Sequence, residues 1–449
     1  MKKILGFAAA LLLLIPSLAT AIDMSDVEFG GQVRMRGYAL ENMWSFNSDL
    51  DFDEWDVFRL KASLWTRVNL GDNVSAFIQL TDQTYGEGVV QFDAGRNALG
   101  ERDVWEEDNK SNKIFLDNAY IDAKNVLGPI SLRIGRQNLI YGSGFVILDG
   151  QSQFASTSIY FDGVKATMDI TDNISLDAFY MKDQENTRSN LTEDDINLMG
   201  LYLTATGCPV IRGKQEFYVL NREDESLDKD IWMFGIRVSD KFDFGLDYSA
   251  EVAVQRGDAW EDRDDDVPGY TAGDQEALGY KLDLGYTIPI DLSPRVFGQY
   301  VFMSGDEADT DDWEGWDVFY GGWPQFGDLL AWVYVFGPAV VSDPAGSTIG
   351  EAAYTNLHIA TIGAEFNIED KLFPKFSYSR LQFDEDNAVY GLNDDDFGDY
   401  YQFSAKYKYS KMLSFAAYYA IIEPGDGVQD LAESDDNAQE FFWEAEVKF

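Results

Sequence analysis

The sequence contains very little cysteine, histidine or positive charge. Cys208 is the one cysteine among 449 residues, so the chain cannot form an internal disulfide, and His358 is the one histidine. Lysine and arginine number 34 against 79 acidic residues, which gives a formal net charge of −45. Nucleic acid is excluded as a partner because its phosphates require cationic side chains. We expect no enzyme and no cofactor, because a hydrolytic dyad would have to use His358 and no serine motif or metal-ligand cluster accompanies it.

Beyond residue 21 the sequence lacks a continuous apolar run long enough for a transmembrane helix, which needs about 20 residues. At the start, two lysines precede an apolar run from Ile4 to Ile15, and Ala19-Thr20-Ala21 offers small residues for cleavage. This pattern predicts a signal peptide over residues 1–21 and one mature domain over 22–449, with a net charge of −47 once the two lysines are removed. A retained membrane anchor is the less favoured alternative, because the apolar run is short.

The whole sequence has 39 glycines and 15% aromatic residues. In place of long apolar runs, it shows an alternation of apolar and polar side chains. This period of two predicts β-strands with one apolar and one polar face. The clearest segments are 27–36, 58–68, 244–255, 280–286 and the C-terminal 441–449. Most are about as long as a tilted membrane-spanning strand.

The connections between these segments alternate in length. Eight are short and rich in Gly, Asn, Asp or Pro, as tight turns require: 69–73, 125–129, 171–173, 206–213, 239–243, 288–294, 368–374 and 409–412. Between successive short connections lies one longer, mostly acidic segment, such as 41–54, 84–112, 256–276 or 304–353. This predicts an all-β, up-and-down transmembrane barrel of about eighteen strands, with short periplasmic turns and long extracellular loops. A soluble two-sheet sandwich is the less favoured alternative.

Several stretches of this sequence resemble one known family. They are "NAYIDAK" (118–124), "LRIGRQNLIYGSG" (132–144), "IYFDGVKATM" (159–168), the long stretch 302–328 and "AIIEPGDGV" (420–428). The chain resembles the alginate-export family of outer-membrane porins. The resemblance implies a monomeric 18-stranded barrel in the bacterial outer membrane that passes an anionic polysaccharide outward through an arginine-lined constriction. The terminal Phe449 resembles the signal that the barrel-assembly machinery reads, so we expect that machinery as a partner.

A channel for a polyanion should carry guanidinium and ammonium groups on its inner wall. Strand parity places several basic residues on the lumen face: Arg34, Arg36, Arg59, Lys61, Arg67, Arg133 and Lys165, with Arg237 and Arg295 farther round. Arg136 is out of phase with Arg133, so either a bulge turns it inward or it lies at the rim. We take the first seven residues and Arg136 as candidates for the pore constriction.

Acidic residues also face the lumen by parity: Asp177, Asp247, Glu251, Asp283, Glu444 and Glu446. The pattern predicts one basic wall on the early strands and one acidic wall on the later strands. Two interpretations remain open. The basic residues form a selective site for an acidic solute, or the charges pair with one another and fix the pore shape. The second would make the protein a general or cation-selective diffusion porin.

The long segments contain six acidic runs: 51–56, 261–266, 305–314, 384–387, 393–399 and 433–436. They are either solvated loops or sites for divalent cations that bridge to neighbouring lipopolysaccharide, although none has the full spacing of a calcium loop. We expect outer-membrane lipid as the surroundings. Segment 304–353 carries the Gly, Pro, Trp and Phe that an inward-folded plug would use. His358 is in phase with Ala360 and Ile362 on the apparent lipid face, which disfavours a barrel-anchored surface enzyme or adhesin.

Overall fold

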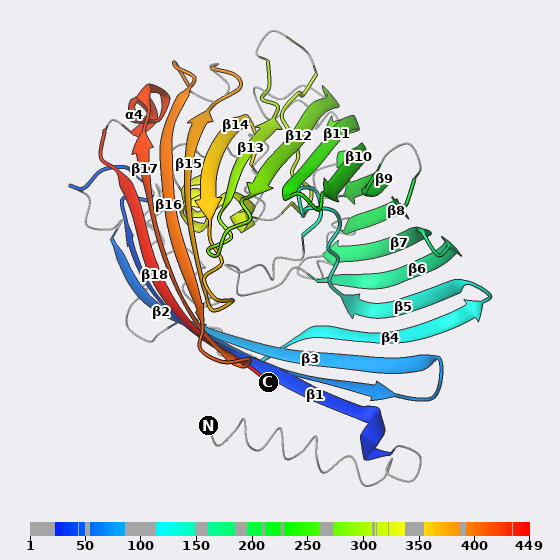
Figure 1. The fold of residues 1–449 in the computed structure, drawn as a ribbon. Helices are drawn as coiled ribbons and strands as arrows, with labels where there is room; N and C mark the ends of the chain where they lie inside the picture. The colour runs from blue at the N-terminus through cyan, green and yellow to red at the C-terminus, as the bar shows by residue number, and fades with distance from the viewer. Residues whose placement is uncertain are drawn as a thin grey trace.

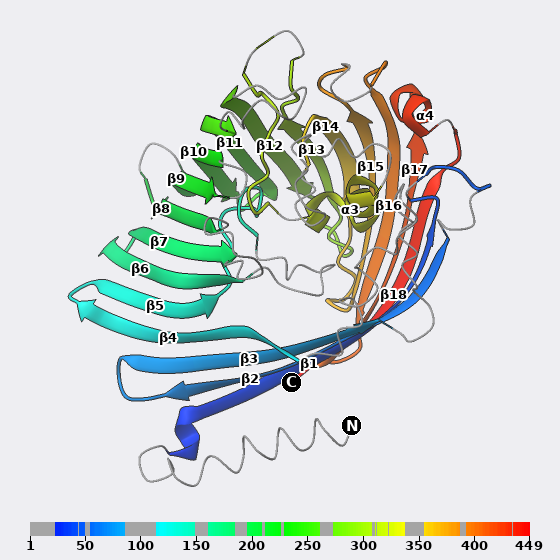
Figure 2. The same cartoon turned by 180° about the vertical axis from the view of Figure 1, so that it is seen from behind.

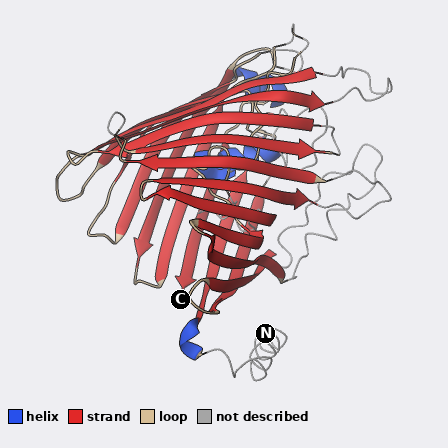
Figure 3. Cartoon of the chain, turned by 90° about the vertical axis from the view of Figure 1, so that its right-hand side faces the viewer, coloured by secondary structure: helices blue, strands red, loops and turns tan. Residues whose placement is uncertain are grey.

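The chain forms one closed antiparallel sheet of 18 strands in the computed structural model (Figures 1 and 3). The structure describes residues 23–43, 45–49, 54–85, 114–148, 160–184, 195–208, 212–225, 229–260, 273–307, 310, 312–321, 323–336, 354–386, 392–432 and 434–449. The predicted signal peptide lies outside these residues. No helix in the described ranges is long and apolar enough to cross a bilayer.

The first nine strands are β1 (Val27–Glu41), β2 (Trp55–Asn69), β3 (Val74–Tyr85), β4 (Phe115–Leu127), β5 (Ile130–Gln137), β6 (Phe161–Thr171), β7 (Ile174–Gln184), β8 (Ile196–Thr206) and β9 (Lys214–Asp224). The second nine are β10 (Lys229–Lys241), β11 (Leu246–Trp260), β12 (Gly273–Thr287), β13 (Arg295–Met303), β14 (Leu357–Glu365), β15 (Leu372–Gln382), β16 (Asp396–Lys408), β17 (Leu413–Pro424) and β18 (Ala438–Lys448). Short helices are η2 (Met24–Asp26), η4 (Trp323–Phe326), α3 (Asp328–Phe336) and α4 (Asp426–Ala432).

The barrel closes where the first strand meets the last. β1 pairs with β2 on one side and with β18 on the other, over the register from Gln32↔Lys448 to Glu41↔Gln439. Phe449 continues this seam, because its backbone N–H donates to Gly31 O at 3.1 Å and its carbonyl accepts from Gly31 N at 2.9 Å. The terminal phenylalanine is therefore held in the closing ladder, where a barrel in lipid needs every backbone group paired.

The apolar face of each strand points outward, as the alternation predicts. Phe29, Val33 and Met35 are exposed on β1, whereas Arg34 and Arg36, in the opposite phase, are buried. The C-terminal strand repeats this pattern, because Phe441 and Trp443 are exposed and Glu444 is buried. An exterior this apolar is what a hydrocarbon solvent requires. The sandwich alternative is excluded by closure of the single sheet.

The eight predicted short connections all join consecutive strands at one end of the barrel, with boundaries shifted by at most a few residues. One prediction about the opposite end is wrong. The connection between β9 and β10 is only four residues, 225–228, and not a long loop.

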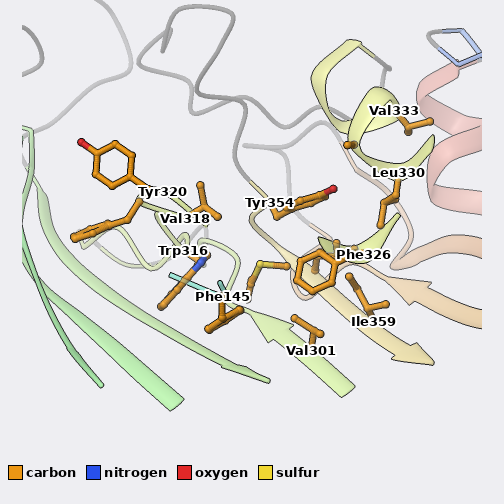
Figure 4. Packing of buried hydrophobic residues seen from close by; sticks show 14 of the residues in the cluster. Phe145, Val301, Trp316, Val318, Tyr320, Phe326, Leu330, Val333, Tyr354 and Ile359 are labelled. Carbon is orange, nitrogen blue, oxygen red and sulfur yellow. The ribbon is translucent and has the colours of Figure 1, made fainter. Parts of the chain in front are cut away.

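A second apolar core lies inside the barrel, toward the long-loop end. Residues after β5, residues 312–321 and the helices η4 and α3 turn inward and bury aromatic and aliphatic side chains (Figures 2 and 4). Phe145 stacks on Trp316 with ring centroids 5.5 Å apart, and Ile147 forms a bridge with Tyr320. The described part of segment 304–353 therefore fills part of the lumen, as an inward-folded plug does; residues 337–353 lie outside the described ranges.

Inward-facing glycines make room for aromatic rings on the neighbouring strand. Gly235 of β10 lies opposite Tyr218 of β9, and a Cβ on Gly235 would meet the Tyr218 ring at 2.1 Å. The ring cannot move away easily, because it stacks on Tyr202 at 5.5 Å and its hydroxyl donates to Glu251 at 3.1 Å. Cross-strand pairs of glycine and an aromatic ring stabilise a curved sheet in this way.

We predict that Gly235→Ala destabilises the barrel by about 1–3 kcal/mol, the usual cost of overpacking. Unfolding in urea, followed by the heat-modifiable shift on electrophoresis, measures the change. Gly298→Ala is the matched control, because a Cβ there meets only Thr361 O at 3.8 Å. Equal stability of the two variants would contradict this account of the Gly235 contact.

Candidate functional site in the barrel lumen

Four basic side chains form a patch on the inner wall of β1 and β2. In the antiparallel register Arg34 lies opposite Lys61, and Arg36 lies opposite Arg59. Like charges directly opposite one another are destabilising unless anions lie nearby. Glu444 of β18 supplies one such anion, because its Oε2 lies 2.7 Å from Arg36 Nε and 4.0 Å from Arg34 Nε. We call Arg34, Arg36, Arg59 and Lys61 the seam patch, since they line the seam where the barrel closes.

Within the seam patch, Arg36 has a structural role. It is almost fully buried, donates to Glu444 and to the Tyr38 hydroxyl at 2.9 Å, and lies 5.0 Å from the centroid of the Phe442 ring. Removing one partner of a buried ion pair leaves an uncompensated charge, which costs several kcal/mol. Arg36 therefore fastens β1 to β18, whereas Arg59 is only partly buried.

Three further candidates lie inward toward the short-turn end. Arg133 forms a bidentate salt bridge with Asp122, with N···O distances of 2.7 and 3.0 Å. Its guanidinium lies 4.0 Å from the Tyr120 ring centroid. Lys165 is 3.5 Å from Asp177, and Arg67 lies over the Phe77 ring at 5.4 Å. These contacts hold the side chains against the wall, so this group lines the pore more than it projects into it.

Arg136 does not belong with the lumen candidates. It bonds to Asp162, with distances of 2.8 and 2.6 Å, and stacks on Tyr160 at 4.0 Å. It shares the outward phase of the strongly exposed Ile134, while the inward phase holds Arg133 and the fully buried Gln137. The regular alternation through β5 contains no bulge at this point, so Arg136 lies at the outer rim. Of the two sequence-based alternatives, the rim position is the observed one.

The later strands carry ion pairs that join adjacent strands or strands two positions apart. Arg237 of β10 pairs with Glu216 of β9 and lies 3.6 Å from Glu251 of β11. Arg295 of β13 pairs with Asp247 at 2.6 Å and with Glu365 at 3.2 Å. These contacts support the interpretation that part of the lumen charge is structural.

The predicted division into a basic and an acidic wall is wrong, because the later strands also place lysines inward. Sequence parity could have identified them, since each lies in phase with buried neighbours on its own strand: Lys241, Lys281, Lys375 and Lys406. Lys281 lies beneath the plug, where its Nζ is 3.4 Å from Gln325 Oε1 of η4. The prediction from the sequence rested on the acidic residues of these strands and left out these four lysines.

The plug is fixed to the wall by polar contacts as well as by its apolar core. Asp317 accepts hydrogen bonds from Arg222 Nη1 at 3.1 and 3.2 Å and from Phe319 N at 2.8 Å. Although burial by itself raises the pKa of Asp317, the charge of Arg222 and these bonds hold that pKa below its usual range. This part of the plug is thus anchored as a carboxylate.

Several carboxyl side chains lie close together at the base of the plug. Asp306 Oδ1 accepts from Glu314 N at 3.1 Å, and Asp384 Oδ2 accepts from Gly305 N at 2.9 Å. Burial raises the pKa of Asp306 to about 7, and the Glu314 and Glu385 carboxylates act in the same direction. In the described ranges no group of three or more side chains could hold a metal ion, so divalent binding by the acidic runs stays a prediction.

His358 lies on the outer face near this base. Its Nδ1 is 2.7 Å from the Tyr300 hydroxyl and its Nε2 is 2.9 Å from Asp384 Oδ1. It is in phase with Ala360 and the strongly exposed Ile362, as expected from the sequence. His358 therefore joins the barrel wall to the loop after β15, away from the lumen.

The family model for alginate export matches residues 25–442, nearly the whole chain. The chain belongs to the alginate export family. Together with the closed barrel, this makes the protein an outer-membrane channel of the porin type. No curated protein matches the sequence.

Solved porin structures share the fold at low sequence identity. A BenF-like porin from Pseudomonas fluorescens Pf-5 is 10% identical, with 94% of this chain and 98% of that chain covered and a TM-score of 0.56. OccAB3 from Acinetobacter baumannii is 12% identical, with 95% and 100% covered and a TM-score of 0.57. OccK2 from Pseudomonas aeruginosa in complex with glucuronate is 11% identical, with 95% and 98% covered and a TM-score of 0.52.

We predict that the base of the plug loosens as pH rises. The ordered loop keeps a proton on Asp306 up to about pH 7, whereas an opened loop releases it near the ordinary value of 3.8. Across that window the ordered state binds more protons, so its stability falls with increasing pH. Hydrogen exchange at the Glu314 amide, corrected for the intrinsic rate, should show falling protection. Asp306→Asn should remove the dependence; an unchanged pH profile in that variant would contradict the assignment.

Proposed function

We propose that this channel passes an anionic polysaccharide, alginate-like, or a similar acidic solute across the bacterial outer membrane by passive diffusion. The observation that carries the proposal is the seam patch, in which four cations occupy two adjacent cross-strand pairs on the inner wall. Family membership supports the same cargo class. The export role for which the family is named also supports the outward direction.

The seam patch suits a carboxylate-bearing solute for an electrostatic reason. Arginine and lysine opposite one another repel, and a passing carboxylate lowers that repulsion while it accepts charge-assisted hydrogen bonds. Guanidinium groups also fit a planar carboxylate with two parallel bonds. A succession of such weak contacts lets an elongated solute advance without being trapped.

The excess of acidic over basic residues in the chain favours export over uptake. The net charge of −45 is concentrated in the long segments at the extracellular end. A polyanion that approached from outside would meet this negative field before it reached the seam patch. A polyanion that approached from the periplasm would meet the lumen lysines first.

A general or cation-selective porin is the second candidate. The pairs Arg36–Glu444, Arg237–Glu216 and Arg295–Asp247 favour it, because each neutralises a basic side chain within the wall. If pairing were complete, the lumen would select little by charge, and the acidic loops would enrich cations at the mouth. Ion selectivity distinguishes the two candidates.

The test is the reversal potential of the purified barrel in a planar bilayer under a salt gradient. We expect anion preference, and we expect Arg59→Gln/Lys61→Met to reduce it. Each charge removed roughly 8 Å from a passing ion changes its free energy by about 0.5 kcal/mol in water, about twofold in partition. Two such losses should lower anion partition about fourfold and raise cation partition by the same factor, so the anion-to-cation permeability ratio should fall about sixteenfold. High salt should diminish the difference, since screening shortens the field.

The matched control removes the same two charges from the outer rim, with Arg136→Gln/Lys182→Met. Both side chains lie on the outward face and pair with Asp162 and Asp195. This variant should keep the wild-type selectivity. Cation preference in the wild-type channel, with no block by an oligouronate, would overturn the proposed cargo and leave the general porin.

The proposal includes no chemical step. His358→Ala should therefore leave conductance and solute passage unchanged, because His358 contacts Tyr300 and Asp384 outside the lumen. The measurement compares channel conductance and hydrolysis of an oligouronate by wild type and variant. Hydrolysis by the wild type that disappears in the variant would show that the barrel is an enzyme.

A further inference from the structure

A cavity of about 500 Å³ lies in the lumen wall at the periplasmic end. It spans the inner faces of strands from β10 round to β18, below the seam patch. Its basic lining residues are Lys241, Arg295, Lys375 and Lys406, and Glu365 is the acidic one. We call it the periplasmic pocket. Its volume is in the usual range for sites that enclose a small ligand.

The charges of the periplasmic pocket are not balanced. Arg295 is satisfied by Asp247 and Glu365, and Lys406 Nζ forms a long ion pair with Glu446 at 3.8 Å, beyond hydrogen-bonding distance. Lys375 forms no ion pair within 4 Å of any described carboxylate, although it lies opposite Glu365 in the register of β14 and β15, and its ammonium lies 5.1 Å from the Phe297 ring centroid. An ammonium group that faces a cavity and is not engaged in a close ion pair can donate to an incoming anion.

The remaining lining is apolar and hydroxylated. Tyr418 and Phe442 stack with ring centroids 5.0 Å apart, and Ser404 and Phe373 complete the wall. Aromatic rings and hydroxyls beside ammonium groups fit a compact ring that carries hydroxyls and one carboxylate. Such a ring is the repeating unit of an acidic polysaccharide, and it is also a free sugar acid.

The pocket and the seam patch lie on one continuous wall. Phe442 lines the pocket, and the Arg36 guanidinium lies 5.0 Å from the centroid of the same ring. A carboxylate that leaves the pocket toward the extracellular end therefore reaches the seam patch next. Lys281 of β12 contacts Gln325 of η4 in the plug, so it adds positive charge at the level of the inward loops.

We propose that the periplasmic pocket is a binding site for a sugar carboxylate, held by the Lys375 and Lys406 ammonium groups. The site receives a uronate unit from the periplasm before that unit reaches the seam patch. This inference rests on the proposed passage of an acidic solute and names the residues that first hold it.

The test is lysine footprinting of the folded, full-length barrel, with glucuronate as the probe. An amine-reactive acetylating reagent is applied with and without glucuronate at constant ionic strength, and mass spectrometry follows each lysine separately. We expect glucuronate to slow acetylation of Lys375 and Lys406 several-fold. Lys411 is the internal control, because it is exposed in the turn 409–412 and outside the pocket. Methyl glucoside, which has the ring without the carboxylate, should protect neither pocket lysine.

A second measurement uses single-channel block by glucuronate added to the periplasmic chamber. Lys375→Met should raise the concentration for half-block about tenfold, as the loss of one charge-assisted bond implies. Lys411→Met should leave it unchanged. A digalacturonate should block at lower concentration than glucuronate if a polymer is the natural ligand, and at equal concentration if the site takes a single sugar acid.

The outcomes separate this inference from the proposed function. Equal acetylation of Lys375 with and without glucuronate, in a channel that still prefers anions, would overturn the pocket alone. Protection of Lys375 in a channel that prefers cations would support the pocket and overturn the proposed passage of anions. Protection of Lys411 to the same degree as Lys375 would show a non-specific effect and would also overturn the pocket.

Discussion

The structure depends on the hydrogen-bonded seam between the first and last strands. Hydrocarbon offers no partner to a backbone amide, so a sheet in a membrane must close on itself or leave a row of unsatisfied groups. Here β18 supplies that partner to β1, and Phe449 extends the ladder by two bonds to Gly31. The same seam brings Glu444 to Arg36, so closing the backbone also neutralises a buried guanidinium.

Closure also sets the chemistry of the lumen. Once the sheet is a barrel, every second side chain points to water in a confined space, where charges interact with neighbours on adjacent strands. Some basic residues then become part of the wall, as Arg295 does between Asp247 and Glu365. Others, such as Lys375, face a cavity and form no ion pair within 4 Å of a described carboxylate, although Glu365 lies opposite on the next strand. This difference separates residues that shape the pore from residues that can hold a solute.

The inward loops form a second packed core inside the channel. Trp316 and Phe145 form an apolar contact across the lumen, and Gln325 reaches Lys281 on the wall. A packed apolar core does not deform continuously, so the plug has a defined resting position. The raised pKa of Asp306 at its base predicts that the stability of this position falls between about pH 4 and pH 7. Passage of a bulky solute thus depends on how the plug is held as well as on the charge of the wall.

The sequence by itself determined the strand count, the closed barrel, the outward apolar face and the inward phase of residues such as Arg34. These follow from a period of two and from turn residues, which are local properties of the chain. Only the tertiary structure decided that Arg136 lies at the rim, that only four residues separate β9 from β10 and that Lys375 faces a pocket. It also decided that Arg36 meets Glu444, which is 408 positions away. The physical reason is that ion pairs and cavities depend on the register between strands and on loops that fold inward, and neither is a local property.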